Sequence, residues 1–87
     1  MKLKIAIKEA FEKLKGCNIK SALLDSEILI SKVLNKNREF VLLNSDFEIN
    51  QKDYYKFQKL ISERKQGKPV SYLTGKKFFW KYEFEIN

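Results

Sequence analysis

The sequence predicts an all-α domain, a small bundle of about five helices, followed by a short β-strand or hairpin at the C-terminus. Apolar residues recur at helical spacing from the beginning of the chain to about residue 65. Glycines that favour helix ends, at Gly16 and Gly67, divide this pattern into segments. After Gly75 the apolar pattern changes to the two-residue alternation of a strand. We therefore expect a helical domain over residues 1–75 and the start of a β-hairpin over residues 76–87.

The first helix is predicted from about Lys2 to Lys15, with Gly16 ending it. Its inward stripe is expected to contain Leu3, Ile7, Ala10, Phe11 and Leu14. The second helix begins after a capping residue, Asn18 or Ser21, and runs to about Leu34. Its apolar face is unusually wide, which predicts a central helix contacted on more than one side. That face is expected to contain Leu23, Leu24, Ile28, Leu29, Ile30, Val33 and Leu34.

Two carboxylates, Asp25 and Glu27, lie near the beginning of the second helix, where negative charge complements the helix dipole. Residues two apart on a helix point in different directions, so this pair cannot act together on one substrate. We interpret both as solvated. Asn35 and Asn37 then predict a break, because asparagine tolerates the left-handed conformation that ends helices.

Three shorter signals complete the helical part of the chain. The segment REFVLLN predicts a short helix with Phe40, Val41 and Leu43 turned inward. A connector held by Phe47 and Ile49 follows it. Asn50 and Asp53 form a capping-box-like start for the fourth helix. That helix is expected to bury Tyr54, Phe57, Leu60 and Ile61. Pro69 suits the first turn of a fifth helix, PVSYLT, closed by Gly75.

The last segment, KFFWKYEFEI, alternates over its second half. Tyr82, Phe84 and Ile86 share one side, and Lys81, Glu83 and Glu85 share the other. An isolated hairpin is marginally stable in water, so the aromatic side needs cover. We infer that the chain is cut at a domain boundary. We expect the segment to fray, to fold back on the helices, or to pair with another chain.

Composition limits the chemistry that this chain can perform. It has 87 residues, enough for one small domain, and a single cysteine, Cys17, that cannot form an internal disulfide. Without histidine there is neither a zinc ligand set nor a Ser-His nucleophile. No apolar run is long enough to span a bilayer, and one thiol suits a reducing compartment. We expect a cytoplasmic protein without a membrane partner.

The net charge of +7 raises the question of nucleic-acid binding. Sixteen lysines stand against only Arg38 and Arg64, and the lysines are spread along the chain rather than gathered in one block. Phosphate recognition favours the bidentate fork of arginine, so we interpret the lysines as a solvated basic surface; the alternative is a surface that faces an acidic partner or RNA. Phe78, Phe79 and Trp80 between lysines could stack on single-stranded nucleic acid, but such aromatics are more often core or interface. Direct nucleic-acid binding is not expected.

Phosphate- and dinucleotide-binding loops are absent from the sequence. A P-loop would place glycine where Val70 stands and a hydroxyl residue where Lys77 stands. There is also no Gly-x-Gly run. The residues alone therefore indicate a segment that is not itself a catalyst.

Two stretches carry a family resemblance that covers most of the chain. SALLDSEILISKVLNKNREFVLLN and ERKQGKPVSYLTGKKFFWKYEFEIN resemble the N-terminal domain and interdomain passage of the release-factor glutamine methyltransferases. The second stretch is the stronger, because an Arg-x-x-Gly-x-Pro-Val-x-Tyr-Leu-x-Gly pattern is followed by Phe-Trp. The residues in register are Arg64, Gly67, Pro69, Val70, Tyr72, Gly75, Phe79 and Trp80.

The resemblance implies that substrate recognition and catalysis belong to different domains. Residues 1–75 would be the N-terminal domain that recognises class 1 peptide chain release factors, and residues 76–87 would begin an interdomain β-hairpin. A following Rossmann-like domain would bind S-adenosylmethionine and methylate the glutamine of the Gly-Gly-Gln motif. Its Asn-Pro-Pro-Tyr motif is absent here, so no catalytic, cofactor-binding or metal-binding residue can be assigned in this segment.

The resemblance also implies which residues make contacts. The catalytic domain would cover the terminal aromatic residues Phe78, Phe79, Trp80, Tyr82 and Phe84. Apart from the resemblance, the basic residues near the fifth helix, Lys68, Lys76 and Lys77, are the candidate contacts for the release factor; the alternative is that they are merely solvated.

Two alternatives remain open from sequence alone. One is a freestanding basic helical module that binds RNA or the ribosome through Lys76, Lys77 and Lys81 with the nearby aromatic residues. The other is a helical protein-interaction module with no enzyme attached. An open reading frame that continues into Asn-Pro-Pro-Tyr would decide in favour of the methyltransferase.

Overall fold

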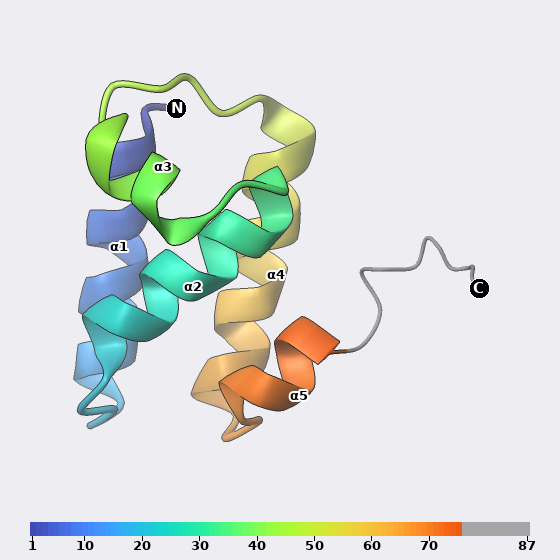
Figure 1. Cartoon of the computed structure of the whole chain (residues 1–87). Helices are drawn as coiled ribbons and strands as arrows, with labels where there is room; N and C mark the ends of the chain where they lie inside the picture. Colours follow the sequence, from blue (N-terminus) through green and yellow to red (C-terminus); the bar gives the residue numbers. More distant parts are fainter. Residues whose placement is uncertain (76–87) are drawn as a thin grey trace.

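The computed structural model describes residues 1–75, over which the chain forms five α-helices (Figure 1). They are α1 (Leu3–Gly16), α2 (Ala22–Leu34), α3 (Arg38–Leu43), α4 (Gln51–Lys65) and α5 (Val70–Gly75). The predicted all-α class and the predicted order of helices are therefore confirmed. The strand or hairpin expected after Gly75 lies outside the described residues.

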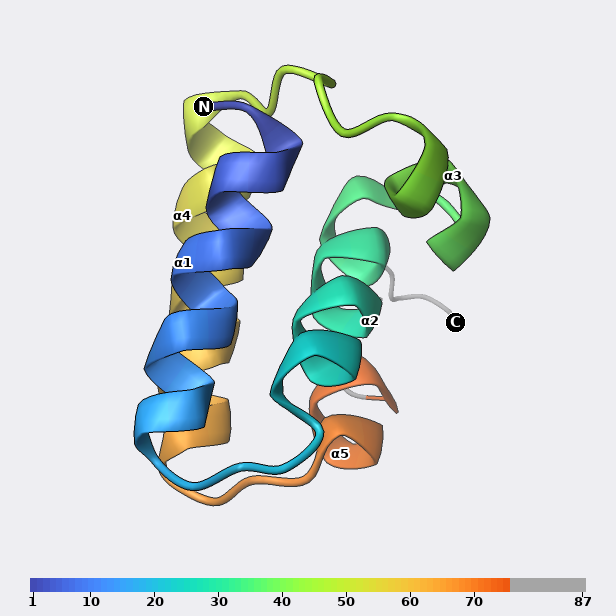
Figure 2. The same ribbon diagram turned by 90° about the vertical axis from the view of Figure 1, so that its left-hand side faces the viewer.

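Helix α2 lies at the centre of the bundle. It contacts each of the other four helices, whereas α4 contacts α1, α2 and α5. Figure 2 shows α1 and α4 running alongside each other, with α3 near one end of α2 and α5 near the other. The central position predicted from the wide apolar face of this helix is confirmed.

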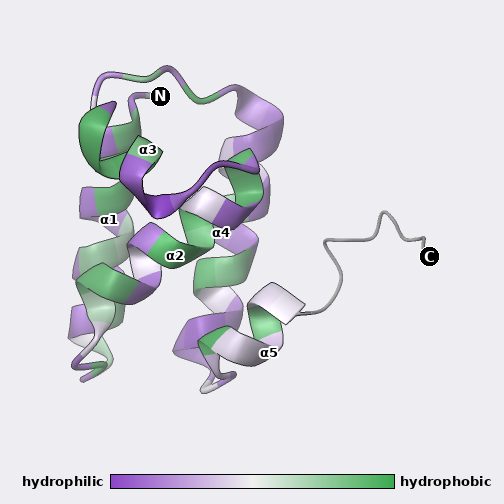
Figure 3. Ribbon diagram, in the orientation of Figure 1, coloured by the Kyte–Doolittle hydropathy of each residue, from purple (hydrophilic) through white to green (hydrophobic). Residues whose placement is uncertain are grey.

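The apolar core fills the space between α1, α2 and α4. It is completed by Val41 of α3, Ile49 of the α3–α4 connector and Leu73 of α5, which are all at most 2% exposed. The remaining buried apolar residues are Leu3, Ala6, Ala10, Leu14, Ala22, Leu29, Ile30, Phe57, Leu60 and Ile61. Figure 3 shows hydrophobic residues along α1 and α2, with hydrophilic residues dominating the first turns of α4. Burial of the larger side chains contributes about 1.5–3 kcal/mol each.

The buried row of α1 differs in part from the predicted stripe. Ala6 and Ala10 are buried, whereas Ile7 and Phe11 are only partly buried and pack against the edge of the core. The two alanines line the contact with α4, together with Tyr54, Phe57 and Ile61 of that helix. A small side chain at these positions lets the two helices approach closely, so the larger residues are displaced to the flank.

The inward face predicted for α2 is partly wrong. Leu23 and Leu24 are 48% and 43% exposed, whereas Ser26 is fully buried. Ser26 can occupy the interior because its hydroxyl donates a hydrogen bond of 2.8 Å to the carbonyl oxygen of Ala22. The helix is apolar around most of its circumference, so the pattern could not show which row faced the core.

Helix α3 also differs from its prediction at one position. Val41 is buried, but Leu43, which was expected to turn inward, is 75% exposed. Leu43 is the last residue of a six-residue helix, so the chain leaves the bundle surface there. Phe40 instead packs edge-on against Phe47, with ring centroids 5.2 Å apart.

Asparagines define three of the helix boundaries. Asn35 adopts the left-handed conformation after α2, at φ 57°, as predicted. Asn37 is extended instead, and its side chain accepts a hydrogen bond from the backbone N–H of Phe40 as the cap of α3. Asn50 caps α4 in the same way, as the capping-box pattern predicted.

The cap of α4 can be tested by substitution of Asn50. The Asn50 side-chain oxygen accepts a 2.8 Å hydrogen bond from the backbone N–H of Asp53. Asn50→Ala removes that acceptor, so we expect a loss of about 1 kcal/mol in the free energy of unfolding. Thermal unfolding followed by circular dichroism should show a midpoint lower by about 4–8 °C. Asn50→Asp retains an acceptor and should unfold near the wild-type midpoint. A midpoint for Asn50→Ala equal to that of Asn50→Asp would contradict the assigned cap.

The beginning of the chain is attached to the α3–α4 connector. The backbone N–H of Leu3 donates to the carbonyl oxygen of Phe47 at 2.8 Å, and that of Ile49 donates to the carbonyl oxygen of Met1 at 2.8 Å. The connector thus supplies acceptors for N–H groups that the first turn of α1 cannot satisfy internally. The α-ammonium of Met1 binds the carboxylate of Glu48. This hydrogen bond and the positive charge hold the pKa of the Glu48 carboxyl below its ordinary value.

Candidate functional site

The chain turns sharply between α4 and α5, and we call residues 63–70 the α4–α5 corner. Gly67 has φ +102°, a left-handed conformation that favours glycine. Its N–H donates to the carbonyl oxygen of Arg64 at 3.0 Å, and the N–H of Lys68 donates to that of Glu63 at 3.3 Å. These two hydrogen bonds form a Schellman motif, which explains why the glycine predicted to end the fourth helix stands at this position.

Arg64 joins this corner to the first turn of α2. Its Nε donates to Oδ2 of Asp25 at 3.0 Å, and its Nη1 donates to the carbonyl oxygen of Lys68 at 3.2 Å. The Ser21 hydroxyl donates to the same carboxylate oxygen at 2.9 Å. The side chains of Arg64 and Asp25 are 19% and 7% exposed, so the ion pair is largely withdrawn from water. One guanidinium therefore fixes two segments that are far apart in sequence.

A second ion pair joins α2 to α3. Arg38 Nη2 lies 2.9 Å from Oε1 of Glu27, and its Nε donates to the same oxygen at 3.0 Å. The Glu27 side chain is 10% exposed and that of Arg38 is 49% exposed. The pair holds the short α3 against the central helix.

The interpretation of Asp25 and Glu27 as solvated is wrong, because both residues are buried and each is paired with an arginine. Asp25 and Glu27 were expected to point in different directions, and their partners do lie on different helices, Arg64 on α4 and Arg38 on α3. A usable signal was present in the composition, since the chain has only two arginines and both occur in these pairs. Arginine is favoured at buried ion pairs because its planar fork donates several hydrogen bonds in fixed directions.

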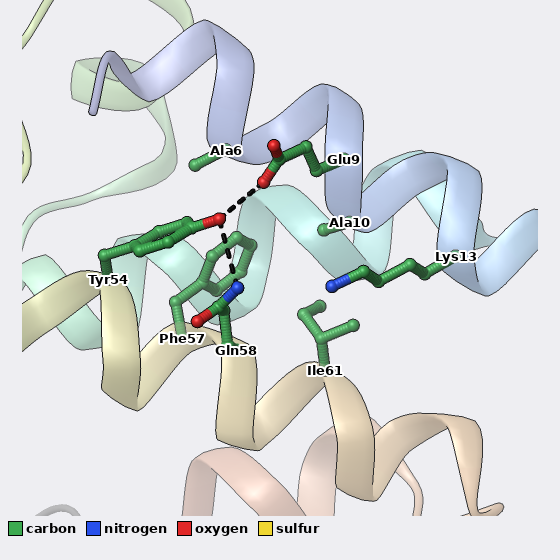
Figure 4. A pocket seen from close by; sticks show the side chains of 8 residues that line it. All are labelled: Ala6, Glu9, Ala10, Lys13, Tyr54, Phe57, Gln58 and Ile61. Atoms are coloured by element: carbon green, nitrogen blue, oxygen red, sulfur yellow. Dashed lines mark hydrogen bonds between the residues drawn. The ribbon is translucent and has the colours of Figure 1, made fainter.

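A third polar contact connects α1 and α4 (Figure 4). The Tyr54 hydroxyl donates to Oε1 of Glu9 at 2.6 Å and accepts a hydrogen bond of 3.0 Å from Nε2 of Gln58. The hydrogen bond to Glu9, followed by burial and the charge of that carboxylate, raises the pKa of the Tyr54 hydroxyl. The phenol therefore remains neutral and keeps donating. The hollow beside it has a volume of about 10 Å³, close to the minimum that one water needs.

The residues predicted to contact partners fall into two groups. Lys68 lies in the α4–α5 corner with its Nζ 3.1 Å from Oε1 of Glu63, and its side chain is 42% exposed. The others lie outside the described residues, namely Lys76, Lys77, Phe78, Phe79, Trp80, Tyr82 and Phe84. Their partner contacts stay predictions.

Residues 1–75 contain no group of three or more His, Cys, Asp or Glu side chains that could hold a metal ion. No helix among these residues is long and apolar enough to cross a membrane.

Comparison with known proteins identifies relatives across nearly the whole chain. The model of the family described as "PrmC N-terminal domain" matches residues 6–75. A bifunctional methyltransferase of Rickettsia conorii is 35% identical over 85 residues, which are 98% of this chain and 16% of the relative. A release factor glutamine methyltransferase of Clostridium botulinum is 36% identical over 86 residues, 99% of this chain and 30% of the relative. No solved structure matches the chain.

Proposed function

Because the chain belongs to the PrmC N-terminal domain family, we propose that it recognises the protein substrate of a methyltransferase and positions it for methyl transfer. The observation that carries this proposal is the family match over residues 6–75, which reaches from α1 through the end of α5. The names of the Rickettsia and Clostridium relatives support a methyltransferase. The chain spans only 16% and 30% of the lengths of these two proteins.

The proposed substrate is a class 1 peptide chain release factor, which acts in translation termination. The methyl group would be placed on the side-chain amide of the glutamine in its Gly-Gly-Gln motif, in the cytoplasm. The name of the Clostridium botulinum relative, a release factor glutamine methyltransferase, supports this choice.

The proposed methyl donor is S-adenosylmethionine, but the residues of this chain do not fit it. The three glycines Gly16, Gly67 and Gly75 are far apart, so there is no glycine-rich turn to accommodate the donor. A single proline, Pro69, excludes an Asn-Pro-Pro-Tyr motif for the target amide. We therefore assign donor binding and catalysis to a separate C-terminal domain.

In this proposal the α4–α5 corner sets the direction in which the chain leaves the helical domain toward the catalytic domain. Arg64 fixes the corner to α2 through Asp25, and the Schellman motif around Gly67 fixes its turn. α5 is also anchored by Leu73, which is fully buried. The interdomain contacts would be made by Phe78, Phe79, Trp80, Tyr82 and Phe84.

A hybrid enzyme tests the proposed function. In it, this chain replaces the aligned 86 residues of the Clostridium botulinum relative. Transfer of labelled methyl groups to a whole class 1 release factor would be compared with transfer to a short peptide containing Gly-Gly-Gln. We expect the hybrid to have a kcat/KM for the whole release factor at least tenfold above that of the catalytic part alone, with most of the difference in KM.

The short peptide is the control for folding of the catalytic part, because it lacks the surface that a recognition domain would contact. Both proteins should methylate it with similar kcat/KM. Equal kcat/KM of the two proteins for the whole release factor, with both active on the peptide, would contradict the proposed function.

A further inference from the structure

The exposed side of α4 carries a row of basic residues around one tyrosine. Lys52, Tyr55, Lys56 and Lys59 follow the i, i+3, i+4, i+7 spacing that places side chains on one helix face. All four residues are exposed, and Tyr55 is 67% exposed. Phe57, Leu60 and Ile61 occupy the opposite, buried side of the helix. We call these four residues the lysine face of α4.

None of these three lysines is neutralised within the described residues. Each of the five ion pairs found in residues 1–75 uses other cations: Met1, Lys4, Arg38, Arg64 and Lys68. Lys52 and Lys56 are four apart and Lys56 and Lys59 are three apart, so like charges adjoin along the helix. Such spacings destabilise an isolated helix slightly.

The lysine face is accessible to a partner over its whole length. Together with Gln51 its residues form one continuous, open stretch of surface along α4. Exposed tyrosine is enriched among the residues that dominate the energy of protein interfaces, because it supplies a large and rather rigid contact surface. Lysines around such a residue steer an oppositely charged partner and increase the association rate.

We infer that the lysine face of α4 binds an acidic patch on the surface of the protein substrate. This inference rests on the proposed function, since the substrate is taken to be the release factor. An acidic protein is favoured over nucleic acid because the face has lysine without arginine and a single aromatic residue. Single-stranded nucleic acid is usually held by several aromatic residues that stack successive bases.

Charge reversal tests the inference in the 87-residue chain. The first variant carries Lys52→Glu, Lys56→Glu and Lys59→Glu, which changes the net charge from +7 to +1. The matched control carries Lys8→Glu, Lys20→Glu and Lys32→Glu, three exposed lysines of other segments, and has the same net charge. Binding to the class 1 release factor of the same organism would be measured by titration calorimetry at two ionic strengths. Circular dichroism would confirm that both variants are folded.

The α4 variant should bind the release factor about 10- to 100-fold more weakly than wild type, and the control less than threefold more weakly. The affinity of the wild-type chain should also fall more with salt than that of the α4 variant. Equal weakening in both variants would overturn the inference, because it would leave only an effect of net charge. Unchanged binding by the α4 variant would overturn it too.

Two further outcomes separate this inference from the proposed function. Failure of the wild-type chain to bind the release factor at all would overturn both. An oligouridylate that displaces the release factor from the wild-type chain, and loses its own affinity for the α4 variant, would overturn the assignment to an acidic protein.

A milder variant examines the aromatic part of the face. Tyr55→Ala should weaken binding by about tenfold while leaving the unfolding midpoint unchanged, because the side chain is exposed. Tyr55→Phe should retain most of the affinity. If Tyr55→Ala bound the release factor as tightly as wild type, Tyr55 would not be part of the proposed contact.

Discussion

Replacement of Arg64 by methionine is expected to lower the free energy of unfolding of the 87-residue chain by about 3–5 kcal/mol. Asp25 is only 7% exposed, and this variant leaves its carboxylate without the guanidinium that neutralises it. The Lys68 carbonyl oxygen loses its 3.2 Å hydrogen bond from Arg64 at the same time. A chain of this length has a net stability of about 4–13 kcal/mol, so the loss is a large part of the total.

Urea unfolding followed by circular dichroism would measure this loss. Lys65→Met is the matched control, because Lys65 is the next residue of the same helix and is exposed, so its change should stay within about 0.5 kcal/mol. The double variant Asp25→Leu, Arg64→Met removes both charges and should recover most of the lost stability. A single Arg64→Met variant as stable as the Lys65→Met control would show that the ion pair does not hold the α4–α5 corner.

Phe57→Ala should also cost about 3–5 kcal/mol. Phe57 is 1% exposed and is the largest fully buried side chain in the described part of the chain. It projects from α4 toward the two alanines of α1, Ala6 and Ala10 (Figure 4). Because those alanines are small and belong to a helix, they cannot fill the space that the lost ring would leave.

The neighbouring Tyr55 provides a close control for Phe57→Ala. Both residues are aromatic and lie two apart on α4, but Tyr55 is 67% exposed. Tyr55→Ala should therefore change the free energy of unfolding by less than about 0.5 kcal/mol. Equal destabilisation by the two variants, measured by urea unfolding, would contradict the assigned orientation of α4.

Local signals in the sequence were sufficient for the order and ends of the helices. Asn50 caps α4 and Asn35 ends α2 as predicted. Gly67 adopts the positive φ of a helix stop, and α5 begins directly after Pro69. Each of these features depends on a few neighbouring residues, so it can be recognised without knowledge of the tertiary structure.

The inward face of α2 could not be predicted in the same way. Leu24, which was expected to face inward, is exposed, and Ser26, which the predicted face did not include, is buried, because the choice of the buried row depends on what packs against the helix. The partner of Asp25 lies 39 residues away at Arg64, so helical periodicity carries no information about it. The ion pairs of the candidate site were missed for this reason. Only the rarity of arginine in the composition pointed to them.

The backbone hydrogen bonds between the first residues and the α3–α4 connector have a consequence for biosynthesis. The N–H of Leu3 finds its acceptor at Phe47, so the start of α1 remains incomplete until that residue has left the ribosomal exit tunnel. Closing so long a loop costs entropy, which a few hydrogen bonds cannot offset before the core has formed. The first turn of α1 therefore stays frayed in the nascent chain until at least 47 of the 87 residues, more than half, have been translated.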